Sequence, residues 1–358
     1  MKLAGHRTRQ IHVGHVPVGG DAPVSIQTMA KADPRDTDTI VDQLLEAKNA
    51  GCTIARIAVP DMDAVKTITE IRSRTGLPIV ADIHFDYKLA IASAKQGADA
   101  LRINPGNLGG EEKLKAVVDA AGQAQIPIRI GVNAGSLPKE KNSKATKPTA
   151  VAMVETALEW VTKIQNLGFY DIKVSLKAFD VPMTVEAYSS FAMHSDVPLH
   201  LGVTEAGPPL AGAVRSTAAL AQLLPMGIGD TIRISLSGPP VTEVRVGRYL
   251  LIALGLATGP ALVSCPTCGR TKVDLCSVAQ RIEDQMEKLG VQATVAVMGC
   301  EVNGPGEARS ADMGIAYGSG GRGAIFELGR VVARMPNDDL EKALVQRITE
   351  TAKGSSDD

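Results

Sequence analysis

Short runs of β-branched and other apolar residues alternate with longer amphipathic, alanine-rich segments from residue 24 to residue 256. Near-continuous apolar strands, each followed by a helical pattern, are typical of a parallel sheet that helices cover. Eight such units in succession indicate a closed (β/α)8 barrel, the TIM barrel. The eight expected strands are Val24–Met29, Ile54–Val59, Pro78–Ile83, Ala100–Asn104, Ile128–Val132, Asp171–Leu176, Leu199–Thr204 and Thr231–Leu236.

The segments on either side of this pattern complete the expected organisation. Ahead of the first strand, Ile11–Val18 runs into Gly19 and Gly20, which predicts a hairpin that closes the bottom of the barrel. From Ala261 the order changes to strand, helix, strand, glycine-rich hairpin, strand and helix, which predicts a small α+β domain. We expect a barrel domain for substrate at 1–258, the smaller domain at 261–353 and a frayed polar tail at 354–358.

Composition excludes several classes of protein. A net charge of −1 and only 3% aromatic residues do not suit a general nucleic-acid binder, which needs a basic surface and stacking platforms. No apolar run reaches the ~18 residues of a membrane helix, and the first residues lack the apolar stretch of a signal peptide. Five clustered cysteines do not match a secreted disulfide framework. We expect a cytoplasmic protein with reduced thiols and without nucleic-acid or membrane partners.

Three cysteines of the smaller domain predict a metal centre. Cys265 and Cys268 are separated by two residues, a spacing that lets two thiolates bind one centre from a tight turn. Cys300 comes after one expected helix, just ahead of the glycine-rich segment Asn303–Gly306. Three thiolates are one ligand short of a closed tetrahedral site or of a fully cysteine-ligated iron–sulfur cluster. The fourth position is therefore either open to substrate or filled by a ligand other than sulfur.

Cys276 bears on a rival kind of metal site. Together with the other three cysteines it would complete a structural zinc site in a phosphate-binding barrel lyase without redox chemistry. Its place within the expected helix Asp274–Leu289, beside Leu275 and Val278, predicts instead that it packs in the core. A non-enzymatic electron carrier is a further hypothesis, but it leaves the cationic residues of the barrel unexplained.

Basic and polar residues gather at the expected carboxyl ends of the barrel strands, where barrel enzymes bind their substrates. Four arginines and a lysine would repel one another there unless an anion is bound, because these strand ends lack compensating acids. Arg102 shares a strand face with Asn104, and so does Arg233 with Ser235. Such donor pairs match a phosphate or diphosphate. The candidate anion ligands are Arg56, His84, Arg102, Asn104, Arg129, Asn133, Lys177, His200, Arg233 and Ser235.

Each of these side chains also has a structural interpretation. Any single arginine could pair with an acid of the barrel or lie on its surface, and either histidine could be a packed residue at a strand end. Glu205 closes the seventh expected strand, just before Gly207. It could act as a general acid beside the anion in a desolvated site, or it could be the partner of a neighbouring arginine.

Five motifs carry a resemblance to a known family that extends over essentially the whole chain. They are VADIHFDY at Val80–Tyr87, LRINPGN at Leu101–Asn107, LHLGVTEAG at Leu199–Gly207, CPTCGR at Cys265–Arg270 and NGPGE at Asn303–Glu307. On these residues the chain resembles the 4-hydroxy-3-methylbut-2-enyl diphosphate synthase family of the non-mevalonate isoprenoid pathway, the IspG/GcpE proteins. It is similar to the compact bacterial two-domain form, and it departs from the family pattern at Ala30–Asp33 and at Pro208–Pro209.

The resemblance implies a chemistry and a set of ligands. It implies a [4Fe-4S] cluster held by Cys265, Cys268 and Cys300 with Glu307 as the fourth ligand. We expect Asn303, on the same loop as Cys300, to be able to hydrogen-bond the sulfurs of the cluster or the bound oxygen. The implied substrate is 2-C-methyl-D-erythritol 2,4-cyclodiphosphate, whose ring is opened reductively with loss of water. Flavodoxin or ferredoxin would supply the electrons. The resemblance also implies a homodimer in which the cluster domain of each chain caps the barrel of the other.

Overall fold

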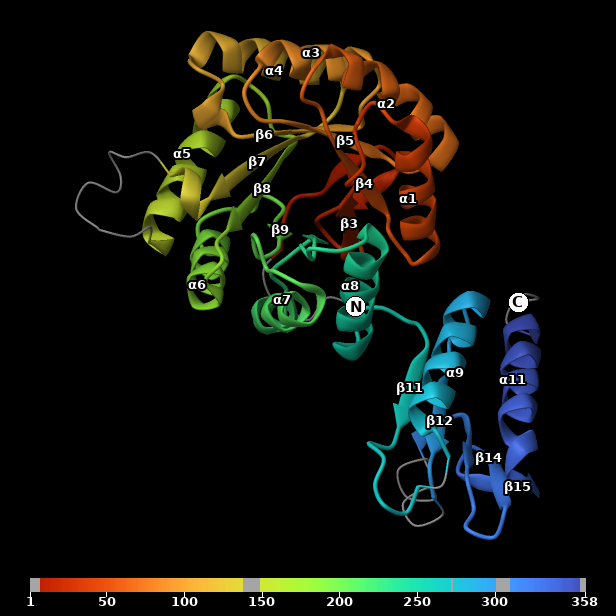
Figure 1. Cartoon of the computed structure of the whole chain (residues 1–358). Helices are drawn as coiled ribbons and strands as arrows, with labels where there is room; N and C mark the ends of the chain where they lie inside the picture. Colours follow the sequence, from red (N-terminus) through yellow and green to blue (C-terminus); the bar gives the residue numbers. More distant parts are fainter. Residues whose placement is uncertain (1–6, 138–148, 272, 301–309, 355–358) are drawn as a thin grey trace. The chain divides into compact units, whose positions relative to one another are not determined.

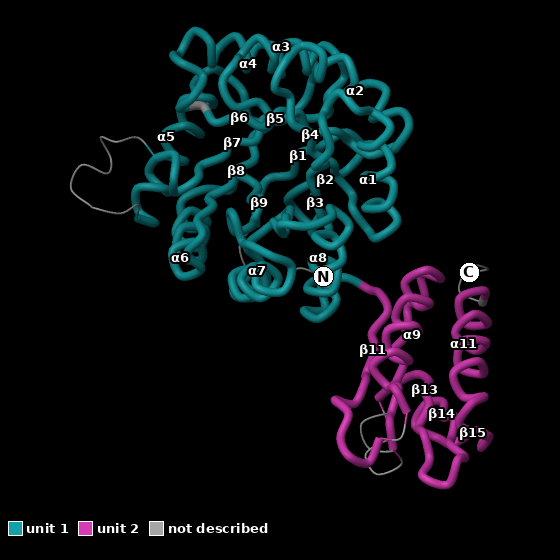
Figure 2. The backbone as a smooth tube through the Cα atoms, in the orientation of Figure 1, with its two compact units in different colours: residues 1–257 teal, residues 258–358 magenta. Residues whose placement is uncertain are grey.

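The computed structural model describes residues 7–137, 149–271, 273–300 and 310–354, in two compact units at 1–257 and 258–358 (Figures 1 and 2). In the first unit eight described parallel strands pair in the order β8-β7-β6-β5-β4-β3-β10-β9. The backbone N–H of Val174 in β8 donates to the carbonyl of Pro198 at 2.9 Å, just ahead of β9, and this contact closes the sheet. The predicted barrel is confirmed. Its strands are β3 Ser25–Met29, β4 Ile54–Ala58, β5 Ile79–Ile83, β6 Ala100–Ile103, β7 Ile128–Asn133, β8 Ile172–Lys177, β9 His200–Leu201 and β10 Thr231–Ile232.

A helix follows each barrel strand and covers its outer face (Figure 1). Outward-pointing strand residues such as Ile57, Leu101 and Ile130 are fully buried against the apolar stripes of these helices. No helix among the described residues is long and apolar enough to cross a membrane. The helices are α1 Thr37–Asn49, α2 Met62–Thr75, α3 Tyr87–Lys95, α4 Glu111–Ala124, α5 Ala150–Asn166, α6 Val181–Ala192, α7 Pro209–Leu223 and α8 Pro240–Ala253.

The last two barrel strands are much shorter than the sequence predicts. Regular pairing covers two residues each in β9 and β10, where runs of six were expected. Beyond His200–Leu201 the two backbones come very close: a Cβ atom on Gly202 would lie 2.6 Å from the carbonyl oxygen of Arg233. Beyond these two pairs both segments continue as irregular structure into the loops that follow.

A hairpin precedes the first barrel strand, as the sequence predicts. Strands β1 Ile11–Val13 and β2 Val16–Val18 pair antiparallel around Gly14, whose φ of +56° suits a tight turn. The buried side chains of the hairpin pack against Ile54, Val80 and Ala100, at the start of β4 to β6. The hairpin therefore plugs the amino-terminal end of the barrel, opposite to the candidate site.

In its described residues the second unit is a five-stranded sheet with two helices on one face (Figure 2). Its parallel strands are β11 Ala261–Ser264, β12 Thr294–Met298 and β13 Met313–Ala316, and β14 Arg322–Glu327 and β15 Arg330–Pro336 continue the sheet antiparallel. Helices α9 Leu275–Leu289 and α11 Asn337–Gly354 pack on it. Cys265 directly follows β11 and Cys300 closely follows β12, so two neighbouring strand ends deliver the predicted ligands. Of the tail expected at 354–358, all but Gly354 lies outside the described residues.

Candidate active site

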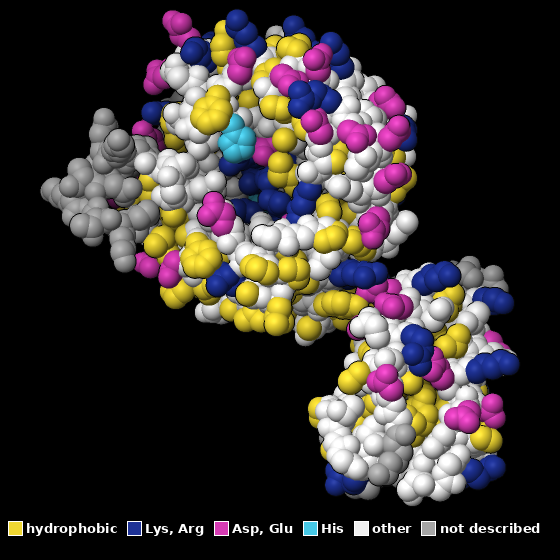
Figure 3. All heavy atoms as spheres, viewed as in Figure 1, with side chains coloured by type: hydrophobic (Ala, Val, Ile, Leu, Met, Phe, Trp, Pro, Cys, Tyr) yellow, Lys and Arg dark blue, Asp and Glu magenta, His cyan; other side chains and the backbone are white. Residues whose placement is uncertain are grey.

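Polar side chains fill the interior of the barrel above its plugged end. Alternation along β4 to β8 sends one set of residues outward to the helices and the other inward. Lys and Arg side chains gather in the opening of this unit (Figure 3). Strand register sets Asp82 beside Arg102 and Arg102 beside Arg129 on three consecutive strands. The buried or half-buried cations nearest the carboxyl ends of the strands are Arg56, Arg102, Arg129, Lys177 and Arg233.

Asp82 neutralises part of this charge. Its carboxylate accepts a hydrogen bond from Arg102 Nη1 at 3.0 Å and lies 3.8 Å from Arg56 Nε. Burial alone would raise the pKa of Asp82, but the charge of Arg56 and a hydrogen bond from His84 hold that pKa far below its usual value. His84 Nε2 also lies 2.9 Å from Arg102 Nη1. This cluster fixes Arg102 with its guanidinium Nε buried and without a partner in the described structure.

Glu243 is a second compensating acid, and sequence reasoning missed it. It lies on α8, a helix outside the strand ends, yet its side chain is only 1% exposed and points into the site. The expectation that the strand ends lack compensating acids is therefore wrong. Two carboxylates, Asp82 and Glu243, face five cations, so a net positive charge remains for an anion to neutralise.

Arg129 crosses the middle of the barrel. Its Nε donates to Ser175 Oγ at 3.2 Å, and its Nη1 lies 3.4 Å from both Gln27 Oε1 and His200 Nε2. Because the arginine donates, His200 accepts as a neutral imidazole. Burial and the charges of Arg129 and Lys177 lower the pKa of His200 well below its usual value. His200 is fully buried at the start of β9, so it supports Arg129 from below the opening.

Two lysines on β8 are buried among these cations. Burial and the nearby charge of Arg129 lower the pKa of Lys173 to about 7, and Lys173 donates to Thr231 Oγ1 at 3.2 Å. Burial and the charges of Arg129 and Arg233 lower the pKa of Lys177 well below its usual value. Across the described parts of the chain Lys177 Nζ has no carboxylate within ion-pair distance. A bound anion would supply the missing charge and restore the ammonium form.

Two glycines of the barrel make room for these side chains. A Cβ atom on Gly131 of β7 would lie 2.9 Å from Arg102 Nε, and one on Gly202 would lie 2.6 Å from Lys177 Nζ. Any other residue would displace the cation. The sequence pattern contains no signal for this role, because a glycine inside a strand run is equally typical of a bulge.

We expect Gly202→Ala to weaken the binding of inorganic pyrophosphate and to lower stability by about 1–3 kcal/mol, because the methyl group overlaps Lys177 and the backbone of Arg233. Calorimetric titration and thermal unfolding measure the two effects. Gly122→Ala is the matched control, since a Cβ there meets only Phe169 at 3.9 Å. Equal affinity in both variants would show that the glycine is not needed to seat Lys177.

The remaining predicted residues lie around the opening. Asn104 is buried and donates to Ser136 Oγ at 3.3 Å, while Asn133 and Ser235 are half-buried. A pocket of about 340 Å³ lies at the ends of β4 and β5, lined by residues that include Asp82, His84 and Phe85. Glu205 is exposed and has a φ of +52°, a strained conformation for a residue other than glycine. The turn after β9 thus holds this carboxylate in a sparsely populated backbone conformation.

The three motif cysteines of the second unit line one small pocket. It has a volume of about 100 Å³, and Cys265, Cys268 and Cys300 surround it together with Pro266, Thr267, Arg270 and Met298. A backbone hydrogen bond from Arg270 lowers the pKa of Cys268, which favours the thiolate. The backbone N–H of Gly299 donates to Cys265 Sγ at 3.4 Å. Within the described ranges no three His, Cys, Asp or Glu side chains lie so that they could hold a single metal ion together.

Cys276 does not take the place that the sequence predicts. It is exposed, so the expectation of a core residue is wrong. Asp274 caps α9 and turns Leu275 and Val278 into the core, which leaves the intervening position facing outward. Cys276 is also absent from the residues that line the cysteine pocket. The predicted ligand Glu307 and the predicted residue Asn303 lie outside the described residues.

Comparison with known proteins identifies close relatives of the whole chain. The family model described as GcpE TIM-barrel domain matches residues 8–248, and the model described as GcpE protein C-terminal domain matches residues 261–350. A Geobacter sulfurreducens protein named 4-hydroxy-3-methylbut-2-en-1-yl diphosphate synthase (flavodoxin) is 52% identical over 96% of this chain and 97% of its own length. A Dehalococcoides mccartyi protein of the same name is 49% identical over 97% of this chain and 99% of its own.

Solved structures show the barrel fold alone. A type I 3-dehydroquinate dehydratase from Clostridium difficile aligns with a TM-score of 0.52 at 15% identity, over 69% of this chain and 98% of its own. A dihydropteroate synthase from Stenotrophomonas maltophilia aligns with a TM-score of 0.51 at 16% identity, over the same shares of the two chains. At such low identity these structures say nothing about the reaction.

Proposed function

Because the chain belongs to the GcpE family, we propose that it performs the reaction for which its curated relatives are named. It converts 2-C-methyl-D-erythritol 2,4-cyclodiphosphate to 4-hydroxy-3-methylbut-2-enyl diphosphate, in non-mevalonate isoprenoid biosynthesis. The substrate takes up two electrons and two protons and loses one molecule of water as its ring opens. The electron donor is flavodoxin, as in the names of the relatives, or ferredoxin.

The observation that carries this proposal is the excess of buried positive charge in the barrel. Burial and the charge of Arg233 lower the pKa of Arg56 to about 9, and burial together with neighbouring cations lowers the pKa values of Arg129 and Lys177 well below their usual values. Charges buried at this cost without enough acids need a multiply charged ligand. A cyclic diphosphate matches in charge and in its many acceptor oxygens. We assign the diphosphate to Arg56, Arg102, Arg129, Lys177 and Arg233, with Asn104, Asn133, His84 and Ser235 at the rim.

The cysteine pocket fits an iron–sulfur cluster. Cys265, Cys268 and Cys300 surround one small space, and backbone N–H groups already donate toward two of the three sulfurs. Thiolates spread around a pocket suit a polynuclear cluster better than a single ion. The four-cysteine zinc site lacks support, because Cys276 does not line this pocket. We assign the [4Fe-4S] cluster to these three cysteines with Glu307 as fourth ligand and Asn303 beside it.

When bound, the cluster supplies the two electrons one at a time. The protein residues do the rest. The barrel cations hold the diphosphate and stabilise the negative charge that it keeps as the ring opens. Glu205 stands at the end of the β9 segment, where it can deliver a proton to the departing oxygen. Water is excluded when the cluster domain of a partner chain covers the opening.

Anaerobically purified protein is expected to absorb at about 400 nm and to turn over the cyclodiphosphate with reduced flavodoxin. The spectrum distinguishes an iron–sulfur protein from the zinc alternative. A colourless protein that contains stoichiometric zinc would refute the proposed function.

Arg233→Ala should cost about 1.5–3 kcal/mol of substrate affinity, because it removes a charge-assisted contact with the diphosphate. A direct titration of protein with its cluster intact measures this loss, and Arg102→Ala should behave alike. Arg74→Ala is the charge-matched control, since Arg74 is exposed on α2 and pairs with Asp38 and Glu70. Equal losses of substrate affinity in Arg233→Ala and Arg74→Ala would show that the effect comes from the net charge of the protein and not from a contact with the diphosphate.

We propose a head-to-tail homodimer in which each barrel works with the cluster of the partner chain. Helices of the barrel run opposite to its strands, so α8 ends at the plugged end, away from the site. The backbone of residues 254–257 is hydrogen-bonded back to the last turn of α8, so the free link to β11 is residues 258–260, which span at most about 11 Å when fully extended. Returning along the length of α8 already takes about 21 Å. These lengths support assembly of each site from two chains.

Mixing two inactive variants should then restore turnover. We expect Arg233→Ala with Glu205→Gln in one chain and Cys300→Ser in the other to recover about a quarter of wild-type activity, because half of randomly paired dimers contain one intact site. Subunit exchange is verified by native mass spectrometry. No recovery despite proven exchange would show that each barrel uses its own cluster.

A further inference from the structure

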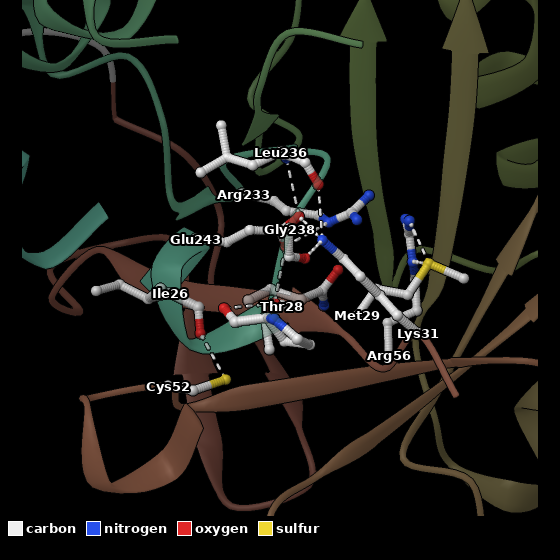
Figure 4. A network of polar contacts seen from close by, with 12 residues as sticks. Ile26, Thr28, Met29, Lys31, Cys52, Arg56, Arg233, Leu236, Gly238 and Glu243 are labelled. Atoms are coloured by element: carbon white, nitrogen blue, oxygen red, sulfur yellow. Dashed lines mark hydrogen bonds and ion pairs between the residues drawn. The ribbon is translucent and has the colours of Figure 1, made fainter. Parts of the chain in front are cut away.

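Three donors, from the end of β3 and its following loop and from the loop after β10, hold the carboxylate of Glu243 in place (Figure 4). Its Oε1 accepts from the backbone N–H of Leu236 at 2.9 Å and from Lys31 Nζ at 2.9 Å. Its Oε2 accepts from Thr28 Oγ1 at 2.9 Å. Lys31 also donates to the carbonyl oxygens of Leu236, at 2.7 Å, and of Gly238. The end of β3, the loop after β10 and helix α8 are therefore joined through one buried acid.

Arg233 lies beside this acid but is not hydrogen-bonded to it. Arg233 Nε is 3.7 Å from Glu243 Oε2, a distance too long for a hydrogen bond. The same Nε is buried and has no hydrogen-bond partner in the described structure. A free carboxylate at this distance would move less than about 1 Å to take both hydrogens of the guanidinium edge. The hydroxyl of Thr28 and the other donors prevent it by holding the carboxylate in place.

We infer that Thr28 and Glu243 are positioning residues that keep Arg233 available for the anion. Glu243 attracts the guanidinium and so fixes where it lies, but its three donors hold the carboxylate beyond hydrogen-bonding distance of Arg233, and the arginine retains its donors for the ligand. Both Arg233 and Lys31 lie near the negative charge of Glu243. When Arg233 binds a diphosphate, the ion pair with Lys31 still balances that charge. The inference rests on the proposed function only in that Arg233 binds a phosphate group.

The test removes the Thr28 hydroxyl without changing side-chain size. In Thr28→Val, Oε2 of Glu243 loses its donor and takes Arg233 instead, so the affinity for inorganic pyrophosphate should fall about tenfold. Thr28→Ser keeps the hydroxyl and should retain wild-type affinity. For the substrate, KM should rise in Thr28→Val while kcat changes little, because saturating ligand recaptures the arginine. Titration calorimetry and steady-state kinetics on the full-length holoenzyme give both quantities.

A matched control separates positioning from stability. Thr156→Val also removes a buried hydroxyl, one that donates to the carbonyl of Ala152 within α5. We expect it to lower the melting temperature about as much as Thr28→Val does and to leave the affinity for pyrophosphate unchanged. In an Arg233→Ala background Thr28→Val should have no further effect on affinity. An equal loss in that background, or no loss in Thr28→Val alone, would overturn the inference. If the wild-type holoenzyme itself fails to bind pyrophosphate, the diphosphate site of the proposed function fails instead.

Discussion

Cys300→Ser is expected to abolish assembly of the iron–sulfur cluster, whereas Cys276→Ser retains it in full. Cys300 shares one pocket with Cys265 and Cys268, and a serine oxygen is a much poorer ligand for iron in such a site than a thiolate. Cys276 is exposed on α9 and does not line that pocket. Iron and sulfide per chain after anaerobic reconstitution measure the difference.

The paired variants also test the zinc hypothesis. A structural zinc site built from four cysteines would lose its metal in both variants, since each would remove one of four ligands. Circular dichroism of each variant shows whether the second unit still folds. Equal loss of metal from both folded variants would contradict our assignment of the ligands.

Glu205→Gln is expected to lower kcat by about 100-fold or more while the affinity for the cyclodiphosphate stays near that of the wild type. An amide of the same size cannot deliver a proton, and general acid catalysis contributes roughly 10²–10⁴ in rate. Glu186→Gln, on α6, removes the same charge away from the opening and serves as the control. Single-turnover kinetics with pre-reduced protein isolate the chemical step. Normal turnover in Glu205→Gln would remove this residue from the mechanism.

The barrel was predictable because its signals are local and repeated. Apolar runs mark all eight strands, and the two-residue period along each strand is sufficient to predict that Arg102, Arg129 and Lys177 point inward. The cysteine pocket was predictable for a similar reason, since Cys265 and Cys300 each follow the end of a strand. Parallel neighbours bring such ends together.

Residues that act across long separations have no such signal. Glu243 is one acid on an amphipathic helix, and only the packing of α8 against β3 turns it toward Thr28 and Arg233. Gly202 matters because the backbone of another strand and the tip of Lys177 approach it, which a one-dimensional pattern does not encode. The expected burial of Cys276 was wrong by one position on a helical wheel, and the capping residue Asp274 sets the true orientation.

The charge excess inside the barrel sets two selective pressures against each other. Replacing Arg129 or Lys177 by an uncharged side chain of similar volume would remove the cost of desolvating the charge and its repulsion by neighbouring cations. The ligand-free protein would then be more stable. The same replacement would abolish binding of the anionic ligand. Evolution toward thermal robustness at these positions is therefore blocked by function. The stability of the folded barrel must therefore come from the apolar layer between strands and helices, or from cellular anions that bind the site between turnovers.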